Sequence, residues 1–277
     1  MERTPLFQSE YQKKMEHLSN FIEKLNSNVI LIFHRHLEHV ESSDLENRLY
    51  NLSNEDLNYT EDISNLMKNA DLSVAFTVDN LRSYLTSYFI LKPEEILALD
   101  SENQKKLFEK IKKENKYTIH DLSSKLSYKN THGTEFDTAM DKAFKDSRPL
   151  DFQVKESDSF REKGEDISSY SFISSEISSV ILKYFKIKNR WHDLSEKKYD
   201  KKNLFRTFCS REFIYACFRA KVTEKVLGVE ERDKYIEYFS KNRGIKFIGI
   251  ISFSENDEVI IEDDFGSLAC SINTLEN

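Results

Sequence analysis

The side chains with the clearest chemical meaning lie in two short segments near the middle of the chain. The first reads GTEFD at residues 133–137, and the second reads LDFQVK at residues 150–155. If the two segments are neighbouring strands, alternation with period two places their polar side chains together on one face. Carboxylate and amide oxygens suit Mg²⁺, and a lysine beside the metal can position or deprotonate an attacking water. This pattern predicts Asp137, Gln153 and Lys155 as catalytic residues and Asp137 with Glu135 as metal ligands.

On these residues the chain resembles the PD-(D/E)XK nuclease superfamily. The resemblance implies a Mg²⁺-dependent hydrolase of nucleic acids, of restriction or phage-defence type. In it, Asp137 is a Mg²⁺ ligand, Gln153 replaces the usual second carboxylate, and Lys155 acts on the water. The chain departs from the family pattern in having no proline before Asp137.

The same residues also fit a helix. Phe136, Met140 and Phe144 are spaced four apart, and Glu135 and Asp137 would occupy the first turn of a helix beginning near Gly133. Acidic residues in a first turn complement the helix dipole. On this alternative Asp137 faces solvent and the metal site is lost.

A basic stretch from Lys183 to Arg206 contains nine basic and three acidic residues, a net charge of +6 in a chain of net charge −7. Aromatic side chains, including Tyr184, Phe185 and Trp191, are interleaved, so phosphate contact and base stacking are both chemically available. The alternative is a solvated charged loop between two helices. The predicted nucleic-acid-binding residues are Lys186, Lys188, Arg190, Trp191, Lys197 and Lys198.

Histidines and cysteines supply weaker candidates. The segment from His34 to His39, HRHLEH, resembles the HxHxDH motif of metallo-β-lactamase-like hydrolases, with Glu38 in place of Asp. If this segment is helical, His34 and His36 point in opposite directions and cannot share a zinc ion, although His36 and His39 could. Cys209 and Cys217 fall on an apolar face of an expected helix, which predicts thiols buried in a core.

The low content of glycine and proline, 6 and 3 residues, removes most of the turns that all-β folds require, so we expect helix to dominate. Apolar spacing of three and four predicts one long helix over 10–40, either continuous or broken near 26–28. It also predicts helices over 44–52, 54–68, 78–91, 93–114, 202–227 and 231–243. Residues 151–155 are expected as a strand, and 245–254 with 259–265 as a β-hairpin.

The expected fold class is therefore α+β and predominantly helical. Long N-terminal helices precede a mixed region with a small β-sheet and a C-terminal hairpin. The change from purely helical to mixed helical and strand patterns suggests a helical region over 1–130 and a mixed α/β region over 131–277, or one continuous domain.

Composition limits where the protein acts. No apolar run is long enough to cross a bilayer and the N-terminus lacks signal-peptide features, so we expect a cytoplasmic protein without membrane insertion. The acidic segment from Glu255 to Asp264 resembles the C-terminal signals of some bacterial type IV secretion substrates, although a charged hairpin explains it equally well. It motivates an alternative function: a helical bacterial effector or regulator that binds a partner protein.

Overall fold

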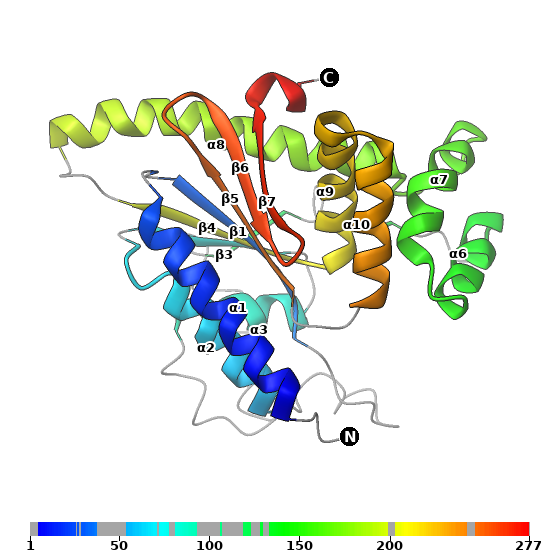
Figure 1. Ribbon diagram of the computed structural model, residues 1–277, viewed down its shortest axis with the longest axis horizontal. Coiled ribbons are helices and arrows are strands. Elements are labelled where there is room, and N and C mark those ends of the chain that lie inside the picture. The colour runs from blue at the N-terminus through cyan, green and yellow to red at the C-terminus, as the bar shows by residue number, and fades with distance from the viewer. Residues whose placement is uncertain are drawn as a thin grey trace.

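The computed structural model describes residues 5–25, 27, 29–37, 54–70, 72–77, 81–92, 106, 119–122, 128–129, 133–198, 203–242 and 247–276. Its described strands form one seven-stranded sheet in the order β3-β2-β4-β1-β5-β6-β7 (Figure 1). The strands are β1 (Val29–Arg35), β2 (Leu72–Thr77), β3 (Ile119–Asp121), β4 (Leu204–Ser210), β5 (Ile248–Phe253), β6 (Glu258–Asp263) and β7 (Gly266–Ser271).

The sheet has a parallel half and an antiparallel half that meet at β1. Strands β3, β2, β4 and β1 run parallel, whereas β5, β6 and β7 add to the other edge of β1 in antiparallel order. The run Val29–Phe33 is almost entirely buried, as expected for a central strand covered on both faces. Its hydrophobic residues therefore serve both faces of the sheet in alternation.

Two separate cores give the molecule three layers. On one face, which we call the α3 face, Ile30 and Ile32 pack with helices α1 (Pro5–Lys24), α2 (Asn54–Leu66) and α3 (Leu81–Leu91). On the other face, the α9 face, Leu31 and Phe33 pack with a larger helical layer. That layer consists of α6 (Glu135–Lys145), α7 (Pro149–Glu162), α8 (Tyr170–Lys198), α9 (Glu212–Leu227), α10 (Val229–Lys241) and the short 3₁₀ helix η3 (Ile272–Leu275).

Helix α9 approaches the sheet closely at one glycine. A Cβ atom placed on Gly249 of β5 would lie 2.4 Å from the ring of Tyr215, so any larger residue would collide with a fully buried aromatic side chain. Tyr215 in turn contacts the rings of Phe33, Phe218 and Phe247. Gly249 is therefore required by packing of this helix on the sheet.

The expectation of a predominantly helical α+β fold is wrong, because the protein is mixed α/β with a large central sheet. The expected long helix over 10–40 ends at Lys24, and Val29–Arg35 is the central strand. Buried on both faces, β1 has apolar residues at each of its first five positions, Val29–Phe33, and such a run also satisfies helical spacing. The sequence interpretation likewise missed β2 and β3 and left open whether 1–130 and 131–277 are one domain. A single sheet takes strands from both.

Later elements were anticipated with mixed success. The expected helix over 202–227 contains β4 followed by α9, and the expected strand over 151–155 lies inside α7. Helices over 54–68, 78–91 and 231–243 are matched by α2, α3 and α10, and the hairpin is confirmed by the antiparallel pair β5–β6. The expected helix over 44–52, and that over 93–114 apart from Lys106, lie outside the described residues.

No helix in the described part of the chain is both long and apolar enough to cross a membrane.

Candidate functional site

Helix α6 contains the predicted metal ligands, and the helical alternative is the correct one. The side chain of Thr134 caps the helix by accepting a hydrogen bond from the backbone N–H of Asp137 at 3.2 Å. In return, Asp137 Oδ2 accepts one from the Gly133 N–H at 3.0 Å. Glu135 and Asp137 thus occupy the first turn, while Phe136 and Met140 face the core. The geometry gives Asp137 a structural role at a helix start.

Helix α7 carries the other two predicted catalytic residues. Gln153 is fully buried: its Oε1 accepts a hydrogen bond from the Tyr128 hydroxyl at 2.9 Å, and its Nε2 donates to the Ser168 carbonyl at 2.6 Å. The Lys155 ammonium lies 2.5 Å from Asp151 one turn earlier, with about half of the lysine side chain exposed. Gln153 therefore pairs with neighbours of its helix, and Lys155 pairs with an acid on the helix surface, and neither contact requires a metal ion.

The paired-strand arrangement of Asp137, Gln153 and Lys155 is wrong, since these residues lie on two helices. Within the described ranges, no group of three or more His, Cys, Asp or Glu side chains could hold a metal ion. Mg²⁺ binding and catalysis by these residues remain predictions. The paired strands from which they were inferred are helices in this structure.

The basic stretch is a helix up to Lys198, not a loop, and its described part has an exposed cationic face. Lys183, Lys186, Ile187 and Arg190 follow the three-and-four spacing of one helical face, and all four are exposed. We call this set the α8 basic face. In the described structure none of its three cations forms an ion pair, and no acidic residue occurs in the sequence from Ile177 to Arg190. Its positive charge is therefore presented to solvent.

Other members of the stretch have structural roles. Lys188 donates to the Ser254 carbonyl at 2.7 Å and lies 3.5 Å from Asp257, which ties α8 to the β5–β6 turn. Tyr184 packs edge-on against Phe208, and Phe185 packs against Phe253. These two rings are thus not available for stacking on bases. The side chains of Trp191, Lys197 and Lys198 lie outside the described residues.

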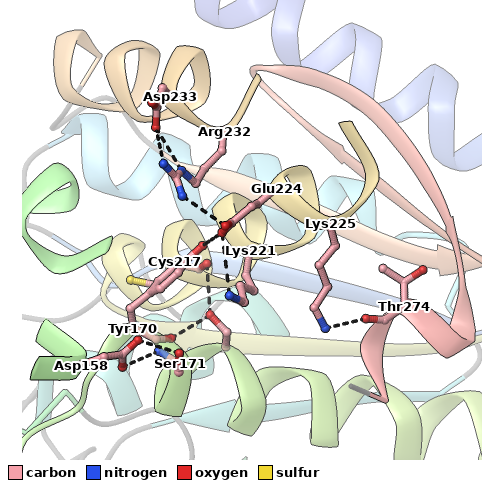
Figure 2. A network of polar contacts seen from close by, with 11 residues as sticks. Asp158, Tyr170, Ser171, Cys217, Lys221, Glu224, Lys225, Arg232, Asp233 and Thr274 are labelled. Carbon is pink, nitrogen blue, oxygen red and sulfur yellow. Dashed lines mark hydrogen bonds and ion pairs between the residues drawn. The ribbon is translucent and has the colours of Figure 1, made fainter. Parts of the chain in front are cut away.

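A polar network that the sequence did not reveal joins α7, α8, α9 and α10 (Figure 2). Glu224 of α9 is its centre. It accepts a hydrogen bond from the Tyr170 hydroxyl at 3.3 Å and forms an ion pair with Arg232 at 3.2 Å. Arg232 also contacts Asp233 at 2.8 Å. Burial, followed by the nearby Glu224 charge, raises the pKa of Tyr170, so the phenol stays a hydrogen-bond donor. The network holds four helices together.

A second buried cluster joins α9 to the end of β6. Asp263 Oδ2 accepts hydrogen bonds from Tyr215 at 3.0 Å and from Arg219 Nε at 3.1 Å, while Oδ1 accepts one from the Phe265 N–H. Arg219 also donates to Thr223 and to the Gly266 carbonyl. We call this set the Asp263 cluster. Although burial raises the pKa of Asp263, three donors surround its carboxylate.

The neighbouring acids of the same segment face the other layer. Glu262 lies 2.8 Å from His17, and Asp264 lies 2.7 Å from Lys14, both on α1. Alternation along β6 thus sends successive carboxylates to opposite faces of the sheet. This part of the acidic segment links the strand to both helical layers, as the charged-hairpin alternative allowed.

No protein-family model matches the chain, and a search of curated proteins finds no significant match. Function must therefore be inferred from the chain's own residues.

Proposed function

We propose that this protein binds nucleic acid, without sequence preference, through the α8 basic face. The observation that supports the proposal is the exposure of Lys183, Lys186 and Arg190 on one side of a helix with no carboxylate paired to them in the described structure. The face spans eight residues, whose seven helical steps rise about 10 Å, close to three nucleotide steps along one strand. Three phosphates can therefore be contacted by one helical face.

The inward packing of Tyr184 and Phe185 supports a binding mode dominated by phosphate contacts. Contacts of this kind depend strongly on salt because each one releases a counterion. With three contacts, the logarithm of the association constant should fall with the logarithm of salt concentration with a slope of about −2.7 for duplex DNA and about −2.1 for single strands. Such binding discriminates weakly among sequences.

Fluorescence anisotropy with labelled single-stranded and duplex DNA and RNA, between 50 and 200 mM salt, tests the proposal. The double variant Lys183→Ala with Lys186→Ala should weaken binding and reduce the slope by about two contacts. The charge-matched control is Lys142→Ala with Lys145→Ala in the last turn of α6, both exposed. Equal affinity of the two double variants, or no salt dependence in the wild type, would refute binding by this face.

Hydrolysis of the bound nucleic acid with Mg²⁺ is tested in the same samples. Cleavage by the wild type that is lost in Lys155→Ala would support the catalytic prediction, whereas equal cleavage by both would remove it.

The second candidate, binding of a partner protein as an effector or regulator, is favoured by the corner between α9 and α10. There Leu227 and Val229 are each about half exposed on either side of Gly228. If the nucleic-acid assays are negative, Leu227→Ser is the variant with which to test this candidate.

A further inference from the structure

A small polar patch is buried in the apolar α3 face, where the parallel strands end. Because neighbouring strands are in register, Thr77 of β2, Cys209 of β4 and His34 of β1 stand side by side in one row. Thr207, one step earlier on β4, lies diagonally beside His34 on the same face. All four side chains are at most 2% exposed. Helix α3 lies on the same face and places Ser87, also fully buried, in that layer.

Two polar atoms of this patch, His34 Nε2 and Thr207 Oγ1, have no hydrogen-bond partner in the described structure and are shielded from solvent. Ser87 Oγ, on helix α3 in the same layer, is a third such atom. Buried polar atoms are nearly always paired, and each exception calls for an explanation such as a bound ion or water. His34 Nε2 and Thr207 Oγ1 come from adjacent parallel strands, and His34 is one residue from the carboxyl end of β1. In open α/β sheets, ligands bind outside these strand ends.

The hydrogen bond of His34 Nδ1 determines which ring nitrogen of this histidine can bind a metal ion. Nδ1 lies 3.2 Å from the Arg35 carbonyl, which only accepts, so Nδ1 carries the proton and Nε2 carries a lone pair. Burial lowers the pKa of His34 to about 4, so the imidazole is neutral at pH 7. An imidazole fixed in this way by a backbone carbonyl is the usual state of a metal-binding histidine.

We propose that His34 Nε2 and Cys209 Sγ bind one monovalent, thiophilic metal ion such as Cu⁺. Binding replaces the thiol proton, which leaves to solvent, so the ion's single positive charge is balanced by the thiolate. A neutral ion–ligand set avoids the large cost of a net charge in an apolar layer. Thiolate ligands favour Cu⁺, Zn²⁺ and iron–sulfur clusters, and of these only Cu⁺ is a monovalent ion.

The ligand set disfavours zinc. Zn²⁺ takes three or four protein ligands, and the described residues contain no third His, Cys, Asp or Glu that would complete such a group. With one thiolate, Zn²⁺ would also leave a net positive charge among Ile32, Ile248 and Ile250, which lie around the patch. The proposal is independent of nucleic-acid binding, since α8 belongs to the opposite layer.

Titration of the reduced full-length protein with Cu⁺ under anaerobic conditions, in competition with a chromophoric Cu⁺ chelator, tests the site. We expect one ion per chain. Cys209→Ser and His34→Leu should each weaken binding by more than about 100-fold, because loss of a ligand costs more than loss of an outer hydrogen-bond partner. The matched controls, Cys217→Ser and Cys270→Ser, remove the other buried thiols and should bind as the wild type does.

X-ray absorption of the wild-type complex keeps the test independent of folding of the variants. Two-coordinate copper with one nitrogen and one sulfur neighbour supports the assignment. Sulfur-only coordination, equal loss of binding in the control variants, or tighter binding of Zn²⁺ than of Cu⁺ would overturn it.

Discussion

The Asp263 cluster and the patch around His34 are both buried against the sheet, yet they differ in how their polar atoms are used. Asp263 receives hydrogen bonds from two side chains and one backbone N–H, and Arg219 shares its remaining donors with Thr223 and Gly266. On the opposite face, His34 Nε2 and Thr207 Oγ1 have no partner. A saturated buried cluster stabilises a fold, whereas an unsaturated one leaves binding capacity. The comparison therefore gives the Asp263 cluster a structural role, and under the metal proposal it gives the patch around His34 a binding role.

The largest effect should come from removing one member of the saturated cluster. Arg219→Met leaves the buried Asp263 carboxylate without its cation, and loss of one partner of a buried ion pair costs about 3–5 kcal/mol of unfolding free energy. Urea denaturation at pH 7 measures it. Arg232→Met, at a more exposed ion pair, is the comparison and should cost clearly less. Equal costs for the two variants would contradict the structural role of the Asp263 cluster.

Burial of His34 in the unsaturated patch should make the free energy of unfolding depend on pH. Unfolded His34 titrates near its usual pKa of about 6.5, and burial lowers the folded value to about 4. Between these values the unfolded chain binds the proton and the folded chain does not, so stability falls as pH is lowered from about 6.5 to about 4. This histidine contributes about 3 kcal/mol to that fall. Unfolding free energies of the wild type and His34→Leu, compared at both ends of this range, isolate its contribution. Parallel pH profiles of the two proteins would show that His34 takes up its proton equally well in the folded and the unfolded chain, which would contradict this prediction.

The helix-joining network of Figure 2 should contribute less to stability than either buried group, because Glu224 is about a quarter exposed. Glu224→Ala removes the acceptor shared by Tyr170 and Arg232, and we expect a loss of about 1–2 kcal/mol. Thermal unfolding followed by circular dichroism is sufficient to detect it. Glu237→Ala, at a solvent-exposed pair with Lys241, should leave the melting temperature unchanged.

The smallest and sharpest contrast uses one isosteric change on each face. Thr223 Oγ1 accepts from Arg219 and donates to the Arg219 carbonyl, so Thr223→Val should cost about 1–2 kcal/mol. Thr207→Val replaces a hydroxyl that has no partner and should be neutral or slightly stabilising in the metal-free protein. Differential scanning calorimetry compares them. A cost at Thr207 as large as that at Thr223 would mean that a bound water already satisfies Thr207.

Local patterns were reliable where one helical face meets solvent. The spacing of Phe136 and Met140, with acids in the first turn, was enough to suggest α6, and Lys241 with Gly244 three residues beyond it indicated the end of α10. The same reasoning failed at β1 and at Leu204–Ser210. A strand buried on both faces shows no alternation and is easily confused with a buried helix.

The candidate residues divide in the same way. The sequence located a basic stretch, but only packing separated Lys188, held by the β5–β6 turn, from Lys183 and Lys186 on the exposed face. The sequence interpretation also placed Cys209 and His34 on two separate helices, and nothing in it predicted that they are neighbours. The parallel register of β1 and β4 makes them adjacent although they are far apart in the chain.

By itself, the sequence determined the amphipathic helices of the surface, the C-terminal hairpin and the positive charge of α8, because these depend on residues a few positions apart. Only the tertiary structure decided which apolar runs form the sheet, which acids pair with α1 or α9, and which polar atoms are left without partners. The Lys14–Asp264 contact, between residues at opposite ends of the chain, illustrates the reason. Pairing over such separations depends on the whole packed core and leaves no local pattern to read.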